Sequence, residues 1–267
     1  MNQDPTPRAR ISAWSHAAFV LTLAASLLAA TAGATSKPET ATASKELASR
    51  PSDTRARLQK GAKALRNGDY ATALSIFTPL AEHGDAKAQN NLGSMYRFGH
   101  GVPQDGAKAL HWYRKAAVQG DAKAQNNLGL MYGLGWGVPR DKAKAIHWYR
   151  KAAVQGDADA QDALGSVYEF GWGVPQDGAK AVHWYRKAAV QGDAKAQNNL
   201  GYMYAHGLGV PQDYVQGAKW FILVQAAGTG ENENTGEELS TLENKMAPAQ
   251  IAQAQRLARK WWAAHHK

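Results

Sequence analysis

A period of 36 residues constrains the fold of this chain more than any other feature of its sequence. The decapeptide GDAKAQNNLG occupies residues 84–93 and returns unchanged at 120–129 and 192–201, while residues 156–165 read GDADAQDALG. The unit 84–119 agrees with each of the next two units at 29 of 36 positions. Units of this length form solenoids or propellers, in which each unit buries its apolar face against its neighbours.

The pattern inside each unit predicts two helices and no strand. In the first unit Ala88, Leu92 and Met95 recur at helical spacing, and Trp112 and Ala116 do the same after the Gly-Pro-rich break GHGVPQD. No stretch of the unit alternates apolar and polar residues, which argues against the strands of a propeller blade. We therefore expect an all-α solenoid of helix–turn–helix repeats.

A glycine stands in the middle of each predicted first helix, at residues 93, 129, 165 and 201. Glycine inside a helix costs about 1 kcal/mol relative to alanine. Because this cost recurs in every unit, we expect a recurring gain. The expected gain is a close approach of the second helix, whose Trp and Tyr side chains fill the space above the glycine.

The first 34 residues have the pattern of a secretory signal. Arg8 and Arg10 precede the apolar run Ala17–Ala30, and the small residues Ala32 and Ala34 mark a cleavage site. The run is too short to span a bilayer comfortably. We expect cleavage near Ala34 and export to the periplasm or beyond, with membrane contact only through this transient segment. An uncleaved anchor is the alternative.

The other domain boundaries follow from composition and from the repeat. Residues 35–54 are polar and contain two prolines, which predicts a disordered linker. We expect an N-terminal capping helical pair at 55–83, then an acidic loop and a C-terminal capping helix at 228–267, with Pro248 in the first turn of that helix. Between them lie four repeats, at 84–119, 120–155, 156–191 and 192–227.

The sequence contains no recognisable catalytic constellation. It has no cysteine, so it forms no disulfide and has no thiol nucleophile. Ser94 and Ser166 follow glycines but lack the G-x-S-x-G pattern, and the glycines of GLGWG lack the spacing of a dinucleotide loop. We therefore expect neither an enzyme nor a cofactor.

Three histidines, His111, His147 and His183, recur once per unit. Packed helices lie roughly 8–10 Å apart, whereas a zinc ion holds its ligands at about 2 Å. Equivalent histidines of different units therefore cannot share one metal ion, and we expect no metal site.

These repeats resemble a known family. The pattern GDAKAQNNLGxMYxxGxGVPxDxxKAxxWYRKAAxQG is similar to the Sel-one-like repeat (SLR), an α/α relative of the tetratricopeptide repeat. GDYATALSIFTPLAEHGD and WFILVQAAG resemble its opening and closing segments, so the resemblance covers roughly residues 55–263. It implies a right-handed α/α superhelical solenoid whose first helices line a concave interaction surface. Some exported members carry a disulfide in each unit, and this chain departs from them because it has no cysteine.

Residues opposite the core stripe of the first helices are the candidate partner-binding residues. They comprise lysines, a ladder of asparagines and the acidic residues of the third unit: Lys87, Asn90, Asn91, Lys123, Asn126, Asn127, Asp159, Asp162, Glu169, Lys195, Asn198 and Asn199. Asparagine amides donate and accept at once, which suits a peptide backbone. The alternative is that they are solvated side chains left by recent duplication.

The third unit reverses the local charge. Lys87, Asn90, Asn91 and Arg97 of the first unit correspond to Asp159, Asp162, Ala163 and Glu169, so the formal charge changes from +2 to −3. One hypothesis is an acidic centre that selects a ligand of matching charge. Drift, or an internal Lys–Asp pair between neighbouring helices, is the other explanation and is slightly favoured.

Two further features bear on partners. Trp136 and Trp172 stand at the tips of the loops between helices and predict either exposed anchors or side chains folded over their own loop. The Arg-Lys pairs of the second helices form a basic stripe: Arg114-Lys115, Arg150-Lys151 and Arg186-Lys187. An exported chain meets little nucleic acid, so we expect none as a partner and interpret the stripe as a solvated face.

Taken together, the residues and the resemblance predict an exported, non-catalytic scaffold that binds a protein or peptide through the concave face of its repeats. Two alternatives stay open. One is a cell-envelope hydrolase acting on β-lactam or cell-wall substrates, against which the missing nucleophile argues. The other is binding of an anionic envelope polymer by the basic stripe, which added salt would weaken.

Overall fold

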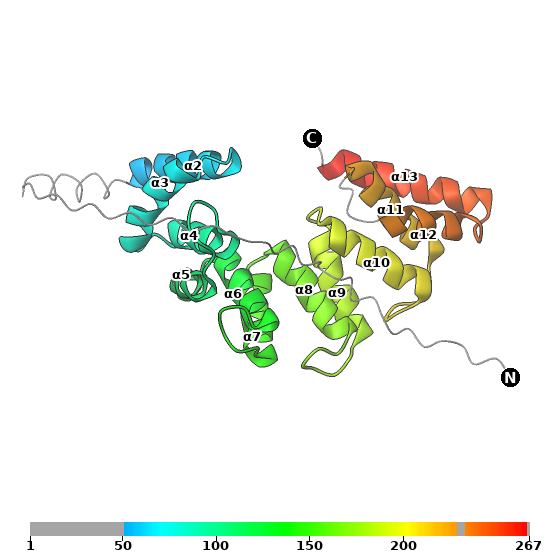
Figure 1. Ribbon diagram of the computed structural model, residues 1–267. Helices are drawn as coiled ribbons and strands as arrows, with labels where there is room; N and C mark the ends of the chain where they lie inside the picture. Colours follow the sequence, from blue (N-terminus) through cyan, green and yellow to red (C-terminus); the bar gives the residue numbers. More distant parts are fainter. Residues whose placement is uncertain (1–50, 229–232, 266–267) are drawn as a thin grey trace, which may run out of the picture. The chain divides into compact units, whose positions relative to one another are not determined.

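A computed structural model describes residues 51–228 and 233–265 of the chain. The regular structure of these residues is entirely helical, with twelve helices and no strand (Figure 1). The helices are α2 (Pro51–Arg66), α3 (Tyr70–Glu82), α4 (Ala86–Phe98), α5 (Gly106–Val118), α6 (Ala122–Leu134), α7 (Lys142–Val154), α8 (Ala158–Glu169), α9 (Gly178–Ala189), α10 (Ala194–His206), α11 (Tyr214–Ala227), α12 (Glu233–Glu243) and α13 (Pro248–His265). The predicted signal, 1–34, and residues 35–50 of the predicted linker lie outside the described residues.

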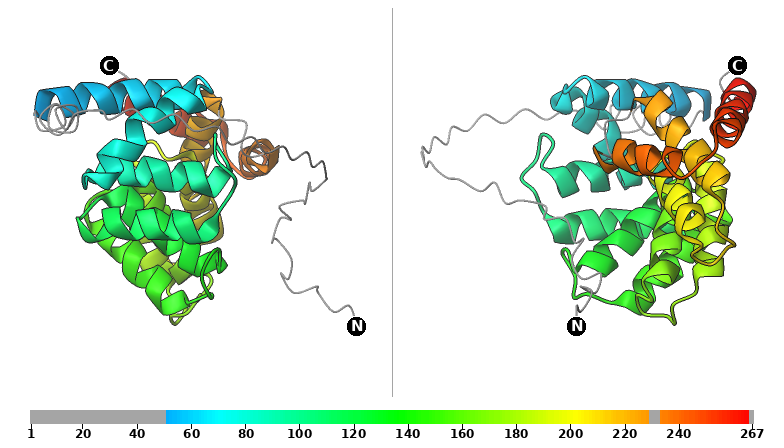
Figure 2. Two further views of the ribbon diagram at one scale, coloured as in Figure 1. Left: turned by 60° about the vertical axis from the view of Figure 1, so that its left-hand side comes forward. Right: turned by 90° about the vertical axis from the view of Figure 1, so that its right-hand side faces the viewer.

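The four repeats form the helical pairs α4/α5, α6/α7, α8/α9 and α10/α11. The two helices of each pair pack on each other, and each second helix also packs on the first helix of the next pair. Figure 2 shows these helices following one another in chain order. The predicted all-α solenoid of helix–turn–helix repeats is confirmed.

Aspartates begin the helices of every repeat. Asp85 accepts a hydrogen bond from the backbone N–H of Ala88 at 2.7 Å, and Asp105 accepts one from Lys108 at 2.9 Å. The same contact recurs at Asp121, Asp141, Asp157, Asp177, Asp193 and Asp213. Each aspartate satisfies a backbone donor that the helix leaves free. Each helix therefore starts directly after an aspartate that occupies the same position in every repeat.

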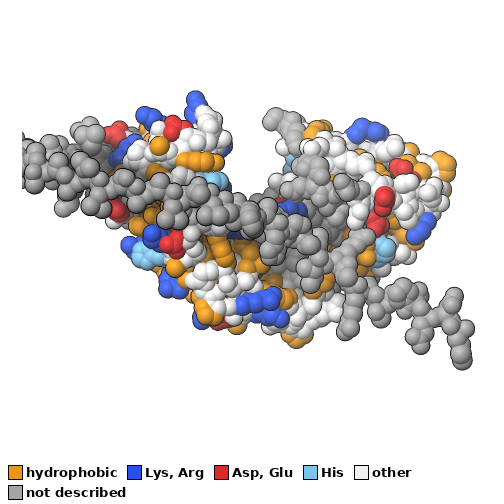
Figure 3. Space-filling model, viewed as in Figure 1, with side chains coloured by type: hydrophobic (Ala, Val, Ile, Leu, Met, Phe, Trp, Pro, Cys, Tyr) orange, Lys and Arg blue, Asp and Glu red, His pale blue; other side chains and the backbone are white. Residues whose placement is uncertain are grey.

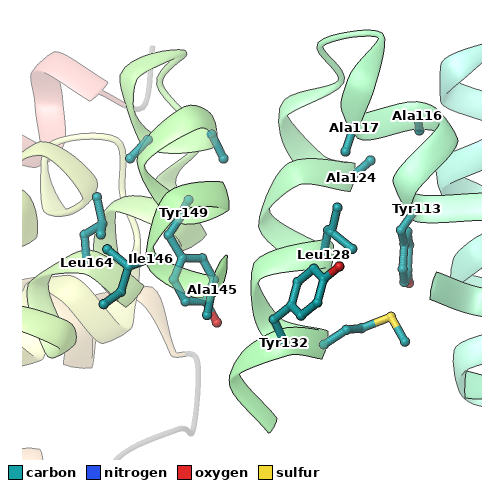
Figure 4. Close-up of a cluster of buried hydrophobic side chains, with 14 of the residues drawn as sticks. Tyr113, Ala116, Ala117, Ala124, Leu128, Tyr132, Ala145, Ile146, Tyr149 and Leu164 are labelled. Carbon is teal, nitrogen blue, oxygen red and sulfur yellow. The ribbon is translucent and has the colours of Figure 1, made fainter. Parts of the chain in front are cut away.

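The mid-helix glycines hold an aromatic ring directly against the backbone of the first helix. A Cβ atom at Gly93 would lie 2.8 Å from Tyr113, one at Gly129 would lie 2.7 Å from Tyr149, and Gly165 and Gly201 face Tyr185 and Phe221 in the same way. Figure 4 shows Tyr113 and Tyr149 among the small side chains of this core. The expected close approach is confirmed, although the space above the glycine is filled by Tyr or Phe and not by Trp.

The pair α2/α3 is a shortened copy of the same unit. A Cβ atom at Gly61 would lie 2.7 Å from the ring of Phe77, which reproduces the contact of Gly93 with Tyr113. The sequence separation is 77 − 61 = 16 in this pair and 113 − 93 = 20 in the first repeat, so its inter-helix loop is four residues shorter. Helix α2 begins at Pro51, inside the segment 35–54 that was expected to be linker.

At the other end, α12 and α13 both pack on α11. Ile222 and Leu223 of α11 replace the Arg-Lys pair of the earlier repeats, and Leu223 is buried together with Ala258 of α13. Pro248 is the first residue of α13, as predicted. The segment expected to be an acidic loop is partly helical, since α12 begins at Glu233. No helix among the described residues is long and apolar enough to cross a membrane.

Candidate partner-binding site

The candidate residues follow one another along α4, α6, α8 and α10, at the same positions of each repeat. We call this surface the first-helix face: Lys87, Asn90, Asn91, Lys123, Asn126, Asn127, Asp159, Asp162, Ala163, Lys195, Asn198 and Asn199. Lys87, Lys123, Asp159 and Lys195 are exposed, whereas the amide positions are half-buried and Asn90 is only 9% exposed. The lysines and Asp159 are thus the most accessible groups of the face.

The asparagine ladder connects neighbouring repeats. Asn127 donates its amide N–H to Oδ1 of Asn90 at 3.0 Å, and Asn199 donates to Oδ1 of Asp162 at 3.1 Å. The Thr235 hydroxyl of α12 donates to Oδ1 of Asn198 at 2.9 Å. Each bond joins residues 37 positions apart; the first two tie one first helix to the next, and the third ties α10 to α12. These amides are therefore partly used inside the protein, which the sequence analysis did not foresee.

Among the junctions between the four repeats, the one between α6 and α8 stays open. The bond that would join α6 to α8 requires a donor at residue 163, and Ala163 has none. In the part of the chain that the structure describes, no hydrogen bond engages the half-buried side chain of Asn126. The amide of Asn126 is therefore free to bind another molecule, next to the repeat whose charge is reversed.

The acidic residues of the third repeat are less acidic than their formal charge suggests. The pKa of Asp162 is raised to about 7: burial is the largest cause and the negative charge of Asp193 adds to it, while the hydrogen bond from Asn199 and the positive charge of Lys195 oppose both. Burial also raises the pKa of Glu169, while the Tyr185 hydroxyl donates to its Oε2 at 2.5 Å and acts in the opposite direction. The expected local charge of −3 is thus an overestimate near neutral pH, and only Asp159 is exposed.

The internal Lys–Asp interaction between neighbouring helices has support at Asp162, where the positive charge of Lys195 in the next repeat acts to lower the pKa. No ion pair joins Asp159 to a lysine within the residues that the structure covers. The exposed carboxylate therefore faces solvent or a partner.

The two loop-tip tryptophans pack toward the preceding repeat. The guanidinium of Arg97 lies 5.8 Å from the ring of Trp136, and that of Arg140 lies 5.5 Å from the ring of Trp172. The ring of Trp172 also reaches the backbone of Gly133 in α6. Both indoles are half-buried, so neither is a fully exposed anchor. Their part in partner binding stays a prediction.

The exposed apolar side chains of these loops are different residues. Phe98 and Leu134 are the last residues of α4 and α6, and Phe170 directly follows α8; the three side chains are 55%, 66% and 73% exposed. The sequence contained a sign of these residues, since all three occupy the same position of the repeat, directly before the glycine that follows the first helix. The sequence analysis named only the two tryptophans as possible exposed anchors.

Buried glutamines are the other feature that the sequence analysis missed. Gln89 donates to the carbonyl of Ala81 at 3.0 Å and accepts from Gln119 at 2.7 Å, so it joins α4 to the ends of α3 and α5. Gln125 and Gln161 repeat both contacts, and Gln197 repeats the first. Each buried amide gives a helix-end carbonyl a second hydrogen bond, beside the one it accepts from the backbone N–H of the following glycine.

The second helices carry a different set of polar contacts. Arg114 donates to the Tyr132 hydroxyl of the next repeat at 3.0 Å, and Arg150 and Arg186 donate to Tyr168 and Tyr204 in the same way. Half of the basic stripe is therefore used between repeats. Figure 3 shows Lys and Arg side chains at several separate places on the molecular surface, with hydrophobic side chains between them.

The histidines of the second helices are exposed, and each packs edge-on to its neighbouring tryptophan. Among the described residues, no group of His, Asp and Glu side chains is placed to hold a metal ion.

The fold and the amide contacts between units define the class of the protein, an α/α repeat solenoid joined through side-chain amides. The sequence model of the Sel1 repeat matches residues 86–121, 122–157, 158–193 and 194–223, which together are 138 of the 267 residues. The chain belongs to the Sel1 repeat family, as the resemblance predicted.

Solved structures agree with this assignment. A protective antigen present in uropathogenic Escherichia coli strains, which displays an SLR fold, is 36% identical with a TM-score of 0.70, over 79% of this chain and 46% of that one. A Sel1 repeat protein from Oxalobacter formigenes is 31% identical with a TM-score of 0.64, over 76% and 82%. An immunity protein from Pseudomonas aeruginosa shares the fold at 23% identity, with a TM-score of 0.50.

Curated relatives match over short stretches. An uncharacterised protein of Neisseria meningitidis is 51% identical over 51 residues, and DAP3-binding cell death enhancer 1 of Mus musculus is 40% identical over 50 residues. These stretches cover 17% and 19% of this chain and only 11% and 10% of those proteins. Sel1-repeat proteins are generally protein-interaction scaffolds, and the repeat solenoid is generally non-catalytic.

Proposed function

We propose that this protein is an exported, non-catalytic scaffold that binds a protein or peptide partner through its first-helix face. One observation carries the proposal. Between α6 and α8 the amide of Asn126 has no partner within the described residues, whereas three other junctions of the ladder are closed by hydrogen bonds. An open amide beside the exposed Lys123 and Asp159 offers a partner both polar contacts and charges of either sign.

The binding site extends over several repeats. Each repeat presents the same register of side chains, so an extended partner meets an exposed charged group once per repeat. Sites of this kind gain affinity by adding modest contacts along a rigid support. The reversal at Asp159 then gives the partner a fixed position along the repeats, because only one repeat accepts a positive group there.

Crosslinking in intact cells tests the proposal. A photoreactive amino acid replaces Lys123 or Asp159 on the first-helix face, and His147 on α7 serves as the matched exposed control. The proposal predicts one dominant crosslinked protein from the first two positions and none from the third. Equal capture from all three positions, or capture from His147 alone, would refute it.

Export is tested separately by the processing of the chain. Mass spectrometry of the protein purified from a periplasmic extract should find an amino terminus near Thr35. A protein that keeps its first residues and stays in the cytoplasmic fraction would contradict the exported scaffold while leaving the binding face intact.

A further inference from the structure

A groove opens between α2 and α4, at the amino-terminal end of the described helices. Its volume is about 870 Å³, and it is lined by residues of the shortened pair and of the first repeat. Two candidate partner-binding residues, Lys87 and Asn91, are among them.

The amide ladder is also interrupted at the junction where this groove lies. Since Gly61 corresponds to Gly93, each residue of α2 corresponds to the residue 32 positions later in α4. By this alignment Leu58 stands where the next repeat has Asn90. A leucine cannot accept the bond that Asn90 accepts from Asn127, so no ladder bond of this kind joins α2 to α4.

The same alignment pairs like residues across the groove. Arg55 of α2 corresponds to Lys87 of α4, and Gln59 corresponds to Asn91. The groove therefore presents two cations and two amides. Leu58 and Ala62, both half-buried, supply an apolar lining beside them.

The charge of the groove is positive. Arg55 and Lys87 are exposed, and neither forms an ion pair with a described residue. The one carboxylate among the lining residues belongs to Asp85, and it accepts the backbone N–H of Ala88 at 2.7 Å, which caps α4. The amide of Asn91 is also without a hydrogen bond inside the described part of the chain.

We propose that this groove binds an acidic peptide segment of the partner in an extended conformation. Carboxylates of the segment pair with Arg55 and Lys87, since guanidinium and ammonium groups form strong charge-assisted hydrogen bonds with carboxylates. The amides of Gln59 and Asn91 bind its backbone, and an apolar side chain of the segment covers Leu58. The inference rests on the proposed function and names the chemistry of its partner. An anionic polymer without amide groups would contact only Arg55 and Lys87 and would leave the two amides of the groove without a partner.

Fluorescence anisotropy with defined peptides tests the groove. The probe is a fluorescein-labelled, amidated hexapeptide of alternating Leu and Glu, and a Leu-Gln hexapeptide is its neutral match. The double variant R55Q/K87Q removes the groove's two cations. The matched control K115Q/K151Q removes two exposed lysines of the second helices, away from the first-helix face, with the same change in net charge.

We expect the unaltered protein to bind the Leu-Glu peptide at least ~10-fold tighter than the Leu-Gln peptide, a difference of about 1.4 kcal/mol. R55Q/K87Q should lose this preference, and K115Q/K151Q should keep it. Equal loss in both variants would mean that net charge alone acts and would overturn the proposal. So would polyphosphate that binds tightly while the peptide does not bind.

The two proposals fail in different ways. If crosslinking at Lys123 captures a partner whose affinity R55Q/K87Q leaves unchanged, the groove proposal is wrong and the scaffold proposal stands. If the peptide binds the groove as described but no partner is captured in cells, the scaffold proposal fails and the groove stands. Circular dichroism and the melting temperature of both double variants show whether each is folded.

Discussion

Replacing Gly129 by alanine tests how the helical pairs are held together. Two effects compete. Alanine is favoured over glycine inside a helix by about 1 kcal/mol. Against this, the new Cβ atom would lie 2.7 Å from Cδ1 and 2.8 Å from Cε1 of Tyr149, and 3.1 Å from the carbonyl oxygen of Ala145. The ring is buried and the carbonyl belongs to the backbone of α7, so neither yields easily.

The structure therefore predicts a net destabilisation. Forcing an extra methyl group into a packed core costs typically about 1–3 kcal/mol, which exceeds the gain in helix propensity. We expect G129A to lower the free energy of unfolding by about 1 kcal/mol. The matched control is G133A in the same helix. There the nearest atom is a ring carbon of Trp172 at 3.1 Å, on a loop, and the fourth repeat already carries Ala205 at this position.

Urea denaturation followed by far-ultraviolet circular dichroism measures both variants, with equal m-values as the condition for comparison. The double variant G129A/Y149L adds a further check, because a smaller side chain relieves the overlap and the two changes should be non-additive. If G129A is as stable as G133A, or more stable than the unaltered protein, the close approach of the two helices does not explain the repeated glycine.

Other variants test the contacts between repeats. Asp162 has a folded-state pKa of about 7, above its ordinary value of 3.8, so the folded protein should lose stability as pH rises from 3.8 to about 7. The variant D162N should remove this loss and be about 1–2 kcal/mol more stable than the unaltered protein at pH 8. Thermal unfolding of both proteins at pH 5 and pH 8 measures the difference. Replacing Gln125 by alanine removes two hydrogen bonds, the buried one to the carbonyl of Ala117 and the half-buried one from the amide of Gln155, and should cost about 2 kcal/mol in urea denaturation. A163N should close the open junction with Asn126, raise stability by about 0.5–1 kcal/mol and reduce partner capture at Lys123; unchanged capture would show that the open amide is not used.

The repeat alone was sufficient to predict the architecture. Helical spacing, the Gly-Pro break and the recurring mid-helix glycine are local features, and they predicted the helical pairs and their close contact. The period also placed the candidate residues on successive first helices. What it left open was which partner each residue meets, because that depends on packing between repeats.

The asparagine ladder illustrates the difference. Position and residue type suggested amides facing outward, yet Asn90 is buried and bonded to Asn127 from the next repeat. The charge of the third repeat is a second case. Formal charges gave −3, but the ionisation of Asp162 depends on its burial and on Asp193, neither of which the sequence reveals. The groove beside Lys87 is a third case, because it forms where α2 packs beside α4. The correspondence of their residues follows from a glycine–aromatic contact that the two helical pairs share.

Hydrogen–deuterium exchange with and without the captured partner tests most directly whether the first-helix face is the binding surface. The account predicts slower exchange in α4, α6 and α8 when the partner is bound, with α5, α7 and α9 unchanged. Protection confined to the second helices, or no protection in any repeat, would contradict it.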